Sequence, residues 1–139
     1  MFELVLSTGS VIALDQMTKR AITAKLSPGQ IVLAGRYFRL HRVANCALAG
    51  VLFNRWALLC LWLGAAACLV LLVWQCHLFE SVSARVAVGG ALGGSSSNLY
   101  DHFREGATID FLDIAGWPVF NIADAAIVVG AISSLWLIR

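Results

Sequence analysis

A charge-free run in the middle of the chain, WALLCLWLGAAACLVLLVW from Trp56 to Trp74, constrains the fold more than any other stretch. A helix of about 20 apolar residues crosses the hydrocarbon core of a bilayer, and this run has nearly that length. Tryptophan stands at both of its ends, as in the aromatic belts where membrane proteins meet water. The run therefore predicts a transmembrane helix.

The composition extends this prediction to the whole chain. Hydrophobic residues make up 60% of its 139 residues and charged residues 13%, and the mean hydropathy is +0.81. So few polar side chains cannot cover the surface of a soluble globule, and a chain of this length suffices for one domain. We expect residues 1–139 to form a single membrane-embedded domain.

Three further segments predict membrane-spanning helices: residues 2–14, which precede the charged DQMTKR, residues 85–100, which are rich in glycine and serine, and residues 120–138. A cleavable signal peptide is not expected at the start, because no basic residue precedes the apolar run and no small-residue cleavage site follows it. We predict an all-α membrane protein with four transmembrane helices. Both termini then lie on one side, and segments 20–55 and 101–119 emerge on the other.

The segment between the first two predicted helices, LSPGQIVLAGRYFRLHRVANCALAG, begins with a Pro-Gly turn at Pro28 and Gly29. β-branched and aromatic residues then alternate with Arg36, Arg39 and Arg42, which is typical of strands. We expect a small extramembrane β-rich segment that lies on the membrane. Because the net charge is only +2, these arginines indicate phospholipid headgroups and other membrane lipids as partners, and not nucleic acid.

Neither a metal site nor a serine nucleophile is indicated. The cysteines and histidines show no CxxC or Cys/His ligand spacing, and no serine lies in a nucleophile elbow. We expect no metal and no cofactor, and we interpret the cysteines as small apolar side chains. These residues are Cys46, Cys60, Cys68 and Cys76, with His41, His77 and His102.

The acidic residues gather at one end of the predicted bundle. Six of the eight lie there: Asp15, Asp101, Glu105, Asp110, Asp113 and Asp124. On helices, Asp15 and Lys19 share a face, as do Asn98 with Asp101 and Asn121 with Asp124. Ionisable groups at membrane depth are costly unless they pair or line a watery cavity, so this convergence indicates a functional site.

Local explanations remain for two of these acids. Asp15 and Lys19 suit a plain ion pair at a helix end as well as a functional role, and Asp124 suits an acid at a helix N-terminus. Neither explains why the polar faces converge. Two carboxyl groups in one low-dielectric site share a proton, which is the chemistry of an aspartyl protease and needs no metal or cofactor.

The chain resembles the lipoprotein signal peptidases, the type II signal peptidase family of membrane aspartyl proteases. The matching pieces occur in family order over nearly the whole chain: DQMTK at 15–19, Asn45 at the position of an N-x-G-A-A-F motif, GGALG at 89–93, NLYD at 98–101, IDF at 109–111 and FNIAD at 120–124. The combination of FNIAD with DQ-x-T-K is fairly specific.

This resemblance implies a catalytic dyad of Asp110 and Asp124. It also implies substrate-binding or supporting roles for Asp15, Lys19, Asn45, Asn98, Asp101, Arg104 and Asn121. The implied substrate is a diacylglyceryl-modified prolipoprotein that is cut just before its lipidated cysteine. The implied location is the bacterial inner membrane, with a multi-pass chain and the active site toward the extracytoplasmic face. Asp113 matches no motif, so we expect it to face solvent and to be dispensable.

Three departures from the family pattern accompany these matches. GSSS at 94–97 stands between GGALG and Asn98, so the helix either rejoins in phase or bulges. His102 replaces the arginine that follows NLYD, with Arg104 two residues on. At the position of the N-x-G-A-A-F motif the sequence reads NCALAG. Most basic residues lie beside the acids, which by the positive-inside rule indicates a cytoplasmic site, opposite to the family topology.

Two other functions are consistent with the same residues. A small proton-coupled or ion-binding membrane protein would use the acids as a relay. A paralogue that binds lipoprotein precursors without cutting them would be consistent with the altered NLYDH and NCALAG motifs.

Overall fold

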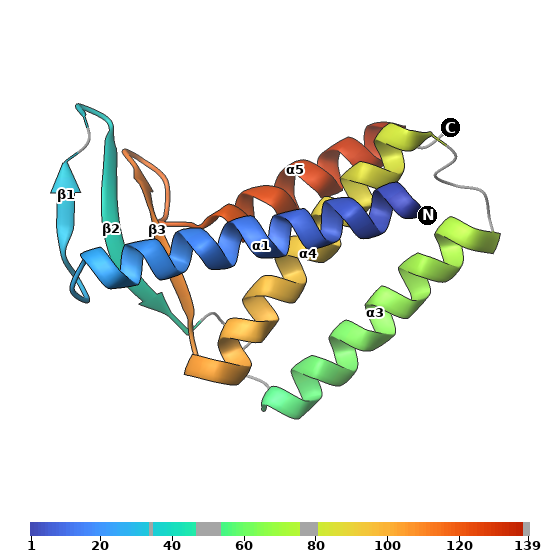
Figure 1. The fold of residues 1–139 in the computed structure, drawn as a ribbon, viewed down its shortest axis with the longest axis horizontal. Coiled ribbons are helices and arrows are strands. Elements are labelled where there is room, and N and C mark those ends of the chain that lie inside the picture. The colour runs from blue at the N-terminus through green and yellow to red at the C-terminus, as the bar shows by residue number, and fades with distance from the viewer. Residues whose placement is uncertain (34, 47–53, 76–80, 138–139) are drawn as a thin grey trace.

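The computed structural model describes residues 1–33, 35–46, 54–75 and 81–137. In this part of the chain, four helices and three strands form the fold (Figure 1). The helices are α1 (Phe2–Lys25), α3 (Arg55–Gln75), α4 (Val82–Glu105) and α5 (Ile122–Leu137). The strands are β1 (Ile31–Leu33), β2 (Phe38–Asn45) and β3 (Thr108–Ile114).

The four predicted helices are present, with different limits. Helix α1 does not end at Leu14 but continues through the charged DQMTKR to Lys25, so Asp15 and Lys19 lie within it. Helix α4 likewise continues past Tyr100 to Glu105. Among the described residues, none of the helices combines the length and the apolar character that a membrane crossing requires. The transmembrane assignment stays a prediction.

Helix α4 lies between α1 and α5, and two adjacent glycines allow this (Figure 1). A Cβ atom at Gly93 would collide with the backbone carbonyl of Thr8 in α1, and one at Gly94 with that of Ala123 in α5. Both helices therefore approach the α4 backbone closely, as small residues permit in membrane helices. The beginning of α1 and the end of α5 lie at the end of the bundle opposite the sheet.

Helix α3 stands apart from α1 and α5 and contacts α4 (Figure 1). The indole nitrogen of Trp62 donates a hydrogen bond of 3.0 Å to Ser95 Oγ. The rings of Trp56 and Phe103 meet edge to face, with centroids 5.7 Å apart. Leu69 of α3 also packs against the buried apolar cluster of Leu4, Ala84 and Val88, so polar, aromatic and aliphatic contacts join this helix to the bundle.

The sheet corrects the sequence prediction, because it is not built only from the segment between the first two helices. Its order is β1-β2-β3, with both pairs antiparallel, and β3 comes from the segment between α4 and α5. In the pairing of β2 with β3, Asn45 lies opposite Thr108 and Val43 opposite Asp110. The catalytic candidate Asp110 is therefore a strand residue.

After β3 the chain folds back on itself before α5 begins. It turns through Gly116, whose φ of 91° lies in the left-handed region that favours glycine. Phe120 then pairs with Leu112, donating its backbone N–H over 3.0 Å and accepting one over 2.8 Å. This return brings the start of α5 beside β3, and so beside Asp110.

Candidate active site

The site is centred on a buried cation, Lys19 of α1, whose side chain is 3% exposed. Its Nζ lies 2.6 Å from Asp15 Oδ2 and 2.6 Å from Asp101 Oδ2, and it donates to Asn98 Oδ1 over 3.0 Å. These contacts occupy all three donors of the ammonium group. The predicted polar faces of α1 and α4 therefore meet, and Asp15 and Lys19, predicted to share a helix face, form an ion pair.

Asp15 connects three helices and is fully buried. Its Oδ2 accepts a hydrogen bond of 2.7 Å from Ser97 Oγ in α4. Its Oδ1 accepts one of 2.9 Å from the backbone N–H of Ala123, in the first turn of α5. A carboxylate at this position satisfies a free N–H group of the helix end and interacts favourably with the helix dipole.

The start of α5 is a reciprocal cap made by Asn121 and Asp124. Asn121 Oδ1 accepts the backbone N–H of Asp124 over 2.8 Å, and Asp124 Oδ2 accepts the backbone N–H of Asn121 over 3.1 Å. This is the geometry of a capping box. The local explanation of Asp124 as a helix N-terminal acid is therefore correct. Its other oxygen, Oδ1, accepts a hydrogen bond of 2.8 Å from Asn98 Nδ2.

Asp110 lies beside this cap, and its side chain is buried. Its Oδ1 accepts a hydrogen bond of 2.7 Å from Asn121 Nδ2, and its Oδ2 one of 2.8 Å from Asn45 Nδ2. Burial raises the pKa of Asp110 above its ordinary value, and the nearby Asp124 adds to this, while the bonds from Asn45 and Asn121 oppose it. The raised pKa favours the protonated form of the Asp110 carboxyl group.

Asn121 joins the two carboxyl groups, because it bonds Asp110 through its side-chain amide and Asp124 through its cap. Asn98 continues the network: its Oδ1 accepts from Lys19, and its Nδ2 donates to Asp124. The structure therefore brings eight predicted site residues into one connected set: Asp15, Lys19, Asn45, Asn98, Asp101, Asp110, Asn121 and Asp124.

Two members of this network were not predicted. Gln16 Nε2 donates to Asp101 Oδ1 over 2.8 Å and to Ser97 Oγ over 2.9 Å. Ser97 is fully buried between Gln16 and Asp15. The available signal was spacing, since Ser97 lies four residues before Asp101 and so shares its helix face.

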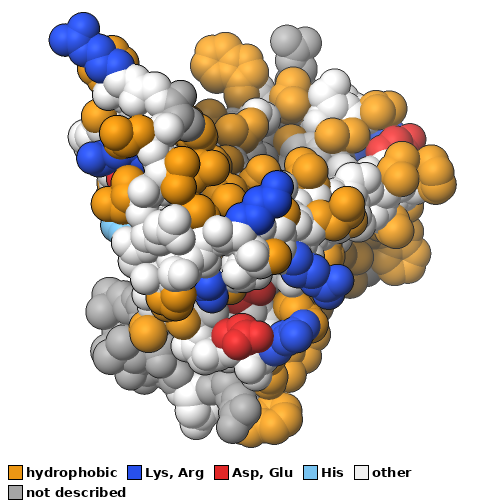
Figure 2. All heavy atoms as spheres, turned by 60° about the vertical axis from the view of Figure 1, so that its left-hand side comes forward, with side chains coloured by type: hydrophobic (Ala, Val, Ile, Leu, Met, Phe, Trp, Pro, Cys, Tyr) orange, Lys and Arg blue, Asp and Glu red, His pale blue; other side chains and the backbone are white. Residues whose placement is uncertain are grey.

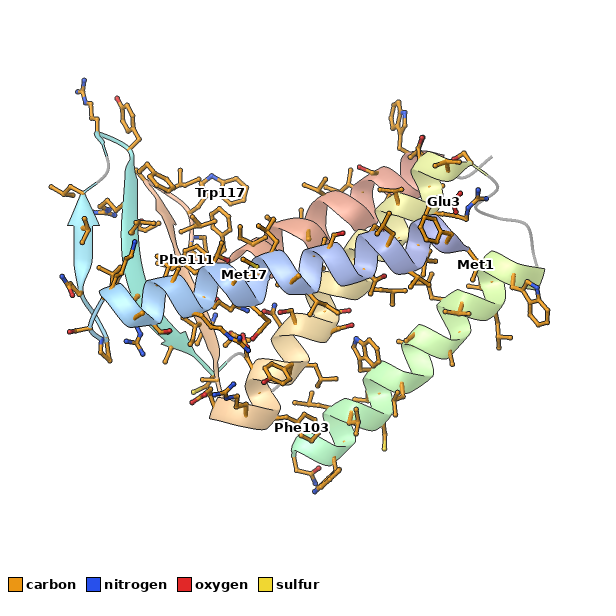
Figure 3. All side chains as sticks on the ribbon, in the orientation of Figure 1. Met1, Glu3, Met17, Phe103, Phe111 and Trp117 are labelled. Carbon is orange, nitrogen blue, oxygen red and sulfur yellow. The ribbon has the colours of Figure 1, made fainter. Side chains whose placement is uncertain are left out.

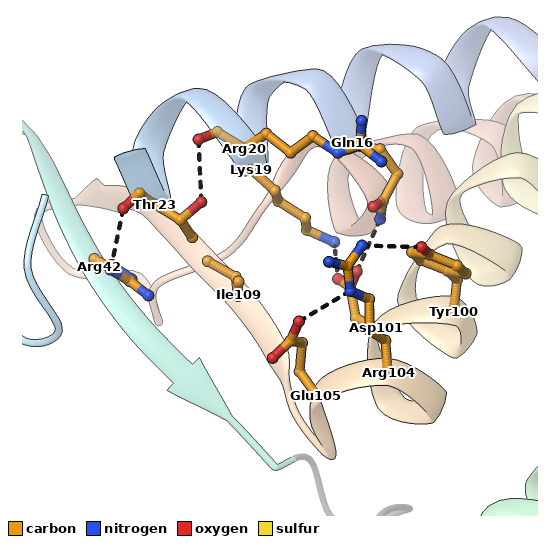
Figure 4. A pocket seen from close by; sticks show the side chains of 10 residues that line it. All are labelled: Gln16, Lys19, Arg20, Thr23, Arg42, Tyr100, Asp101, Arg104, Glu105 and Ile109. Atoms are coloured by element: carbon orange, nitrogen blue, oxygen red, sulfur yellow. Dashed lines mark hydrogen bonds and ion pairs between the residues drawn. The ribbon is translucent and has the colours of Figure 1, made fainter. Parts of the chain in front are cut away.

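Arg104, the ninth predicted site residue, lies outside the buried network. It is exposed, donates to Tyr100 Oη over 3.2 Å and lies 3.2 Å from Glu105 Oε1 (Figure 4). It lines a pocket of about 540 Å³ whose inner wall includes Gln16, Lys19 and Asp101. Figure 2 shows basic and acidic side chains close together on one face of the molecule, with hydrophobic side chains over other parts of that face.

Asp113 corrects a prediction, because it does not face solvent. It is buried, with Oδ2 at 2.9 Å from Arg39 Nε and Oδ1 accepting from Arg39 Nη2 over 3.1 Å. The reason is the strand pairing, which places Arg39 directly opposite Asp113. His41 Nδ1 also lies 3.9 Å from Asp113 Oδ2. Asp113 thus forms a salt bridge that joins β3 to β2.

The described residues contain no group of three or more His, Cys, Asp or Glu side chains arranged to hold a metal ion. Cys46, Cys60 and Cys68 are free and exposed. Cys76 and His77 lie outside the described residues.

Comparison with known proteins is consistent with this geometry. A family model described as signal peptidase (SPase) II matches residues 7–139. The chain is 34% identical to the lipoprotein signal peptidase of Moorella thermoacetica, over 91% of this chain and 85% of that protein. It is 36% identical to the lipoprotein signal peptidase of Burkholderia mallei, over 88% of this chain and 78% of that protein.

Two solved structures share the fold. Both are described as a bacterial membrane enzyme structure by the in meso method, one at 2.3 Å and one at 1.9 Å resolution. Each gives a TM-score of 0.85 and covers 98% of this chain, at 22% and 20% identity. The alignments cover 87% and 92% of those chains.

Proposed function

Because the chain belongs to the signal peptidase II family, we propose that it is a membrane aspartyl endopeptidase with a catalytic dyad of Asp110 and Asp124. In this proposal it removes signal peptides from lipid-modified prolipoproteins and cuts just before the lipidated cysteine. The observation that carries the proposal is Asn121, which hydrogen-bonds both carboxyl groups. A relay of protons or ions needs no such pairing of two acids.

The two carboxyl groups divide the work of hydrolysis. Asp110 holds the shared proton, because burial raises its pKa, and Asp124 begins as the carboxylate, stabilised by donors from Asn98 and Asn121. Asp124 takes a proton from a water molecule whose oxygen attacks the scissile carbonyl carbon, while Asp110 donates its proton to the carbonyl oxygen. When the C–N bond breaks, the proton held by Asp124 passes to the leaving amine, and Asp110 takes a proton back from a hydroxyl of the tetrahedral intermediate as the carboxyl product forms. The two carboxyl groups supply both the general base and the general acid, so the proposed reaction requires no metal or cofactor.

The supporting residues keep this pair in position. Lys19 binds the oxygen of Asn98, which turns the amide NH₂ of Asn98 toward Asp124. Asp15 and Asp101 pair with Lys19, and Asn45, on the neighbouring strand β2, fixes Oδ2 of Asp110. Arg104, at the rim of the adjoining pocket, binds the substrate from outside the network.

The proposed location is the bacterial inner membrane, with a multi-pass chain and the site toward the extracytoplasmic face. Large apolar side chains exposed along the helices support it, among them Leu61 and Leu63 of α3 and Leu135 and Trp136 of α5. Such residues would face lipid. The partners are then membrane lipids and a diacylglyceryl-modified prolipoprotein, and nucleic acid is not among them.

The test is cleavage of a purified lipidated precursor by the protein in detergent, with mass spectrometry of the new N-terminus. Asp110→Asn and Asp124→Asn should each lower kcat/KM by about 10³-fold or more, as expected when a member of a catalytic unit is removed. Each amide keeps the size of the side chain, so the variants should remain folded by thermal unfolding. A wild-type protein that binds the precursor without cutting it would show a non-cleaving paralogue.

A further inference from the structure

Arg42 of β2 is joined to the end of helix α1 by its side chain and to the turn that follows by its backbone. Its Nη1 donates to the carbonyl oxygen of Leu26 over 2.7 Å and to that of Thr23 over 3.4 Å (Figure 4). Its backbone N–H donates to Gln30 O over 3.2 Å, and its carbonyl oxygen accepts the N–H of Gly29 over 2.9 Å. Side chain and backbone therefore both connect this strand residue to α1 and its turn.

The local structure explains why an arginine is suited to this position. The pairing of β2 with β3 shifts register between Leu40 and Val43, so Arg42 lies at an irregularity of the sheet. Such bulges change the direction in which a side chain points. The last carbonyl groups of a helix have no partner within the helix, and a basic side chain satisfies them and interacts favourably with the helix dipole. Arg42 therefore caps α1 from the neighbouring strand.

Both acids of the proposed dyad depend on the two elements that this arginine joins. These elements meet at the end of the molecule that holds the sheet, where their side chains lie together (Figure 3). On α1, Lys19 binds the oxygen of Asn98, and Asn98 donates to Asp124. On β2, Asn45 donates to Asp110 Oδ2 over 2.8 Å. The link between α1 and β2 therefore affects the position of one acid relative to the other.

We propose that Arg42 is a positioning residue for the dyad, an inference that rests on the proposed function. It holds β2 against α1, so that the amide of Asn45 reaches Asp110. Arg42 thus acts on the acid through Asn45 and not by contact. Without this link, β2 can shift at the irregularity and the bond from Asn45 is lost. A displacement of about 1 Å at a catalytic group can lower the rate by as much as about 10²-fold.

Loss of this bond has a consequence with a defined sign. The hydrogen bond from Asn45 lowers the pKa of Asp110, whereas burial raises it. The charged groups that act on Asp110 are Asp124, which raises the pKa, and Lys19, which lowers it. Without the bond the pKa of Asp110 rises further. Because the proposed reaction needs Asp110 in its protonated form, the alkaline limb of the pH dependence of kcat should move to higher pH.

The experiment measures kcat, KM and the pH dependence of kcat for cleavage of a lipidated precursor by the full chain in detergent. We expect Arg42→Gln to lower kcat about tenfold, to leave KM nearly unchanged and to move the alkaline limb upward. Asn45→Ala should have the same effects. The double variant should be no worse than Asn45→Ala alone, because both changes remove the same contact to Asp110. Arg42→Lys keeps a charged donor for the helix end and should retain most of the activity.

Arg39→Gln is the matched control. Arg39 lies on the same strand and carries the same charge, but it bonds Asp113 of β3 and not the end of α1. This variant should have a lower Tm and an alkaline limb at the wild-type pH.

Three results would overturn the role of Arg42 while leaving the proposed function intact. The first is an Arg42→Gln variant with a lower Tm and unchanged kcat, which would make this arginine a structural clamp only. The second is that the effects of Arg42→Gln and Asn45→Ala add in the double variant. The third is an alkaline limb that moves equally in Arg39→Gln, as a general effect of lost charge would produce. A wild-type protein that does not cleave the precursor would instead overturn the proposed function, and this inference with it.

Discussion

At the scale of single residues, the site depends on amides that orient carboxyl groups. Three asparagines donate hydrogen bonds to Asp110 or Asp124: Asn45, Asn98 and Asn121. These bonds fix the orientation of both carboxyl groups. The two acids of the proposed dyad and all three asparagines were predicted from the family resemblance. The orientation of each amide was not, because it depends on contacts between elements far apart in sequence, such as the bond from Lys19 to Asn98.

The raised pKa of Asp110 gives a stability change with a defined sign. The folded protein holds this proton more tightly than the unfolded chain does, so the stabilisation is complete below the ordinary aspartate pKa of about 3.9 and is lost as pH rises through the raised pKa. Asp110→Asn has no proton to lose. We expect the Tm of Asp110→Asn to rise relative to wild type across that interval, measured by thermal unfolding in detergent. Parallel curves at all pH values would contradict this.

Substitution of Asp113 should lower the stability of the protein without lowering its catalytic activity. Asp113→Ala removes both contacts to Arg39, which is 42% exposed and so partly solvated once alone. We expect a loss of about 1–3 kcal/mol in unfolding free energy with kcat retained, measured by denaturant unfolding beside precursor cleavage. Asp110→Ala is the comparison, because it should lose activity. Equal losses of activity in the two variants would show that the wrong acid was assigned to the dyad.

At the scale of elements, α4 resolves the question raised by GSSS at 94–97. The helix is continuous from Val82 to Glu105. In the family pattern GGALGN, two glycines are followed by three residues and then asparagine, and Gly93-Gly94-Ser95-Ser96-Ser97-Asn98 has the same spacing. The glycine pair that packs against α1 and α5 is Gly93 and Gly94. Asn98 is therefore in register, and Ser97 stands where that pattern has its last glycine.

Ser97→Ala tests what this serine contributes. The change removes the hydrogen bond to Asp15 and leaves Gln16 without one acceptor in a buried region. We expect a loss of about 1–3 kcal/mol in unfolding free energy. Ser96→Ala is the matched control, because Ser96 Oγ donates only to Leu92 O of its own helix among the bonds described. It should change stability by less than about 0.5 kcal/mol.

The sequence did not predict strand β3, and it predicted too short a helix for α1. In β3, Asp110 and Asp113 are buried, whereas an alternating pattern assigns acids to the solvent face. In α1, the charges of DQMTKR indicated an end at Leu14, but Lys19 is paired inside the bundle with Asp101 of α4 as well as with Asp15. Both failures have one cause: buried charges were paired by partners from other elements, which local patterns do not reveal.

At the scale of the whole molecule, the sheet and the site lie at one end of the bundle, and α1 begins and α5 ends at the other (Figure 1). That this shared end of α1 and α5 lies on one side of a membrane stays a prediction. The proposed orientation puts the turn at Pro28 and Gly29 outside the cytoplasm. We expect alkaline phosphatase fused there to be active, and green fluorescent protein fused after Leu137 to fluoresce. An inactive phosphatase would reverse the orientation.

The double role of Asn121 has a consequence for how this enzyme fails. The same residue caps α5 and joins the two acids, so the first turn of the helix cannot fray while the dyad remains assembled. When this turn opens, the two acids separate. The free energy of this local opening therefore also sets the fraction of molecules in which the site is assembled. The site can then be disassembled in a molecule whose bundle is otherwise folded, and it re-forms when Asn121 caps the helix again.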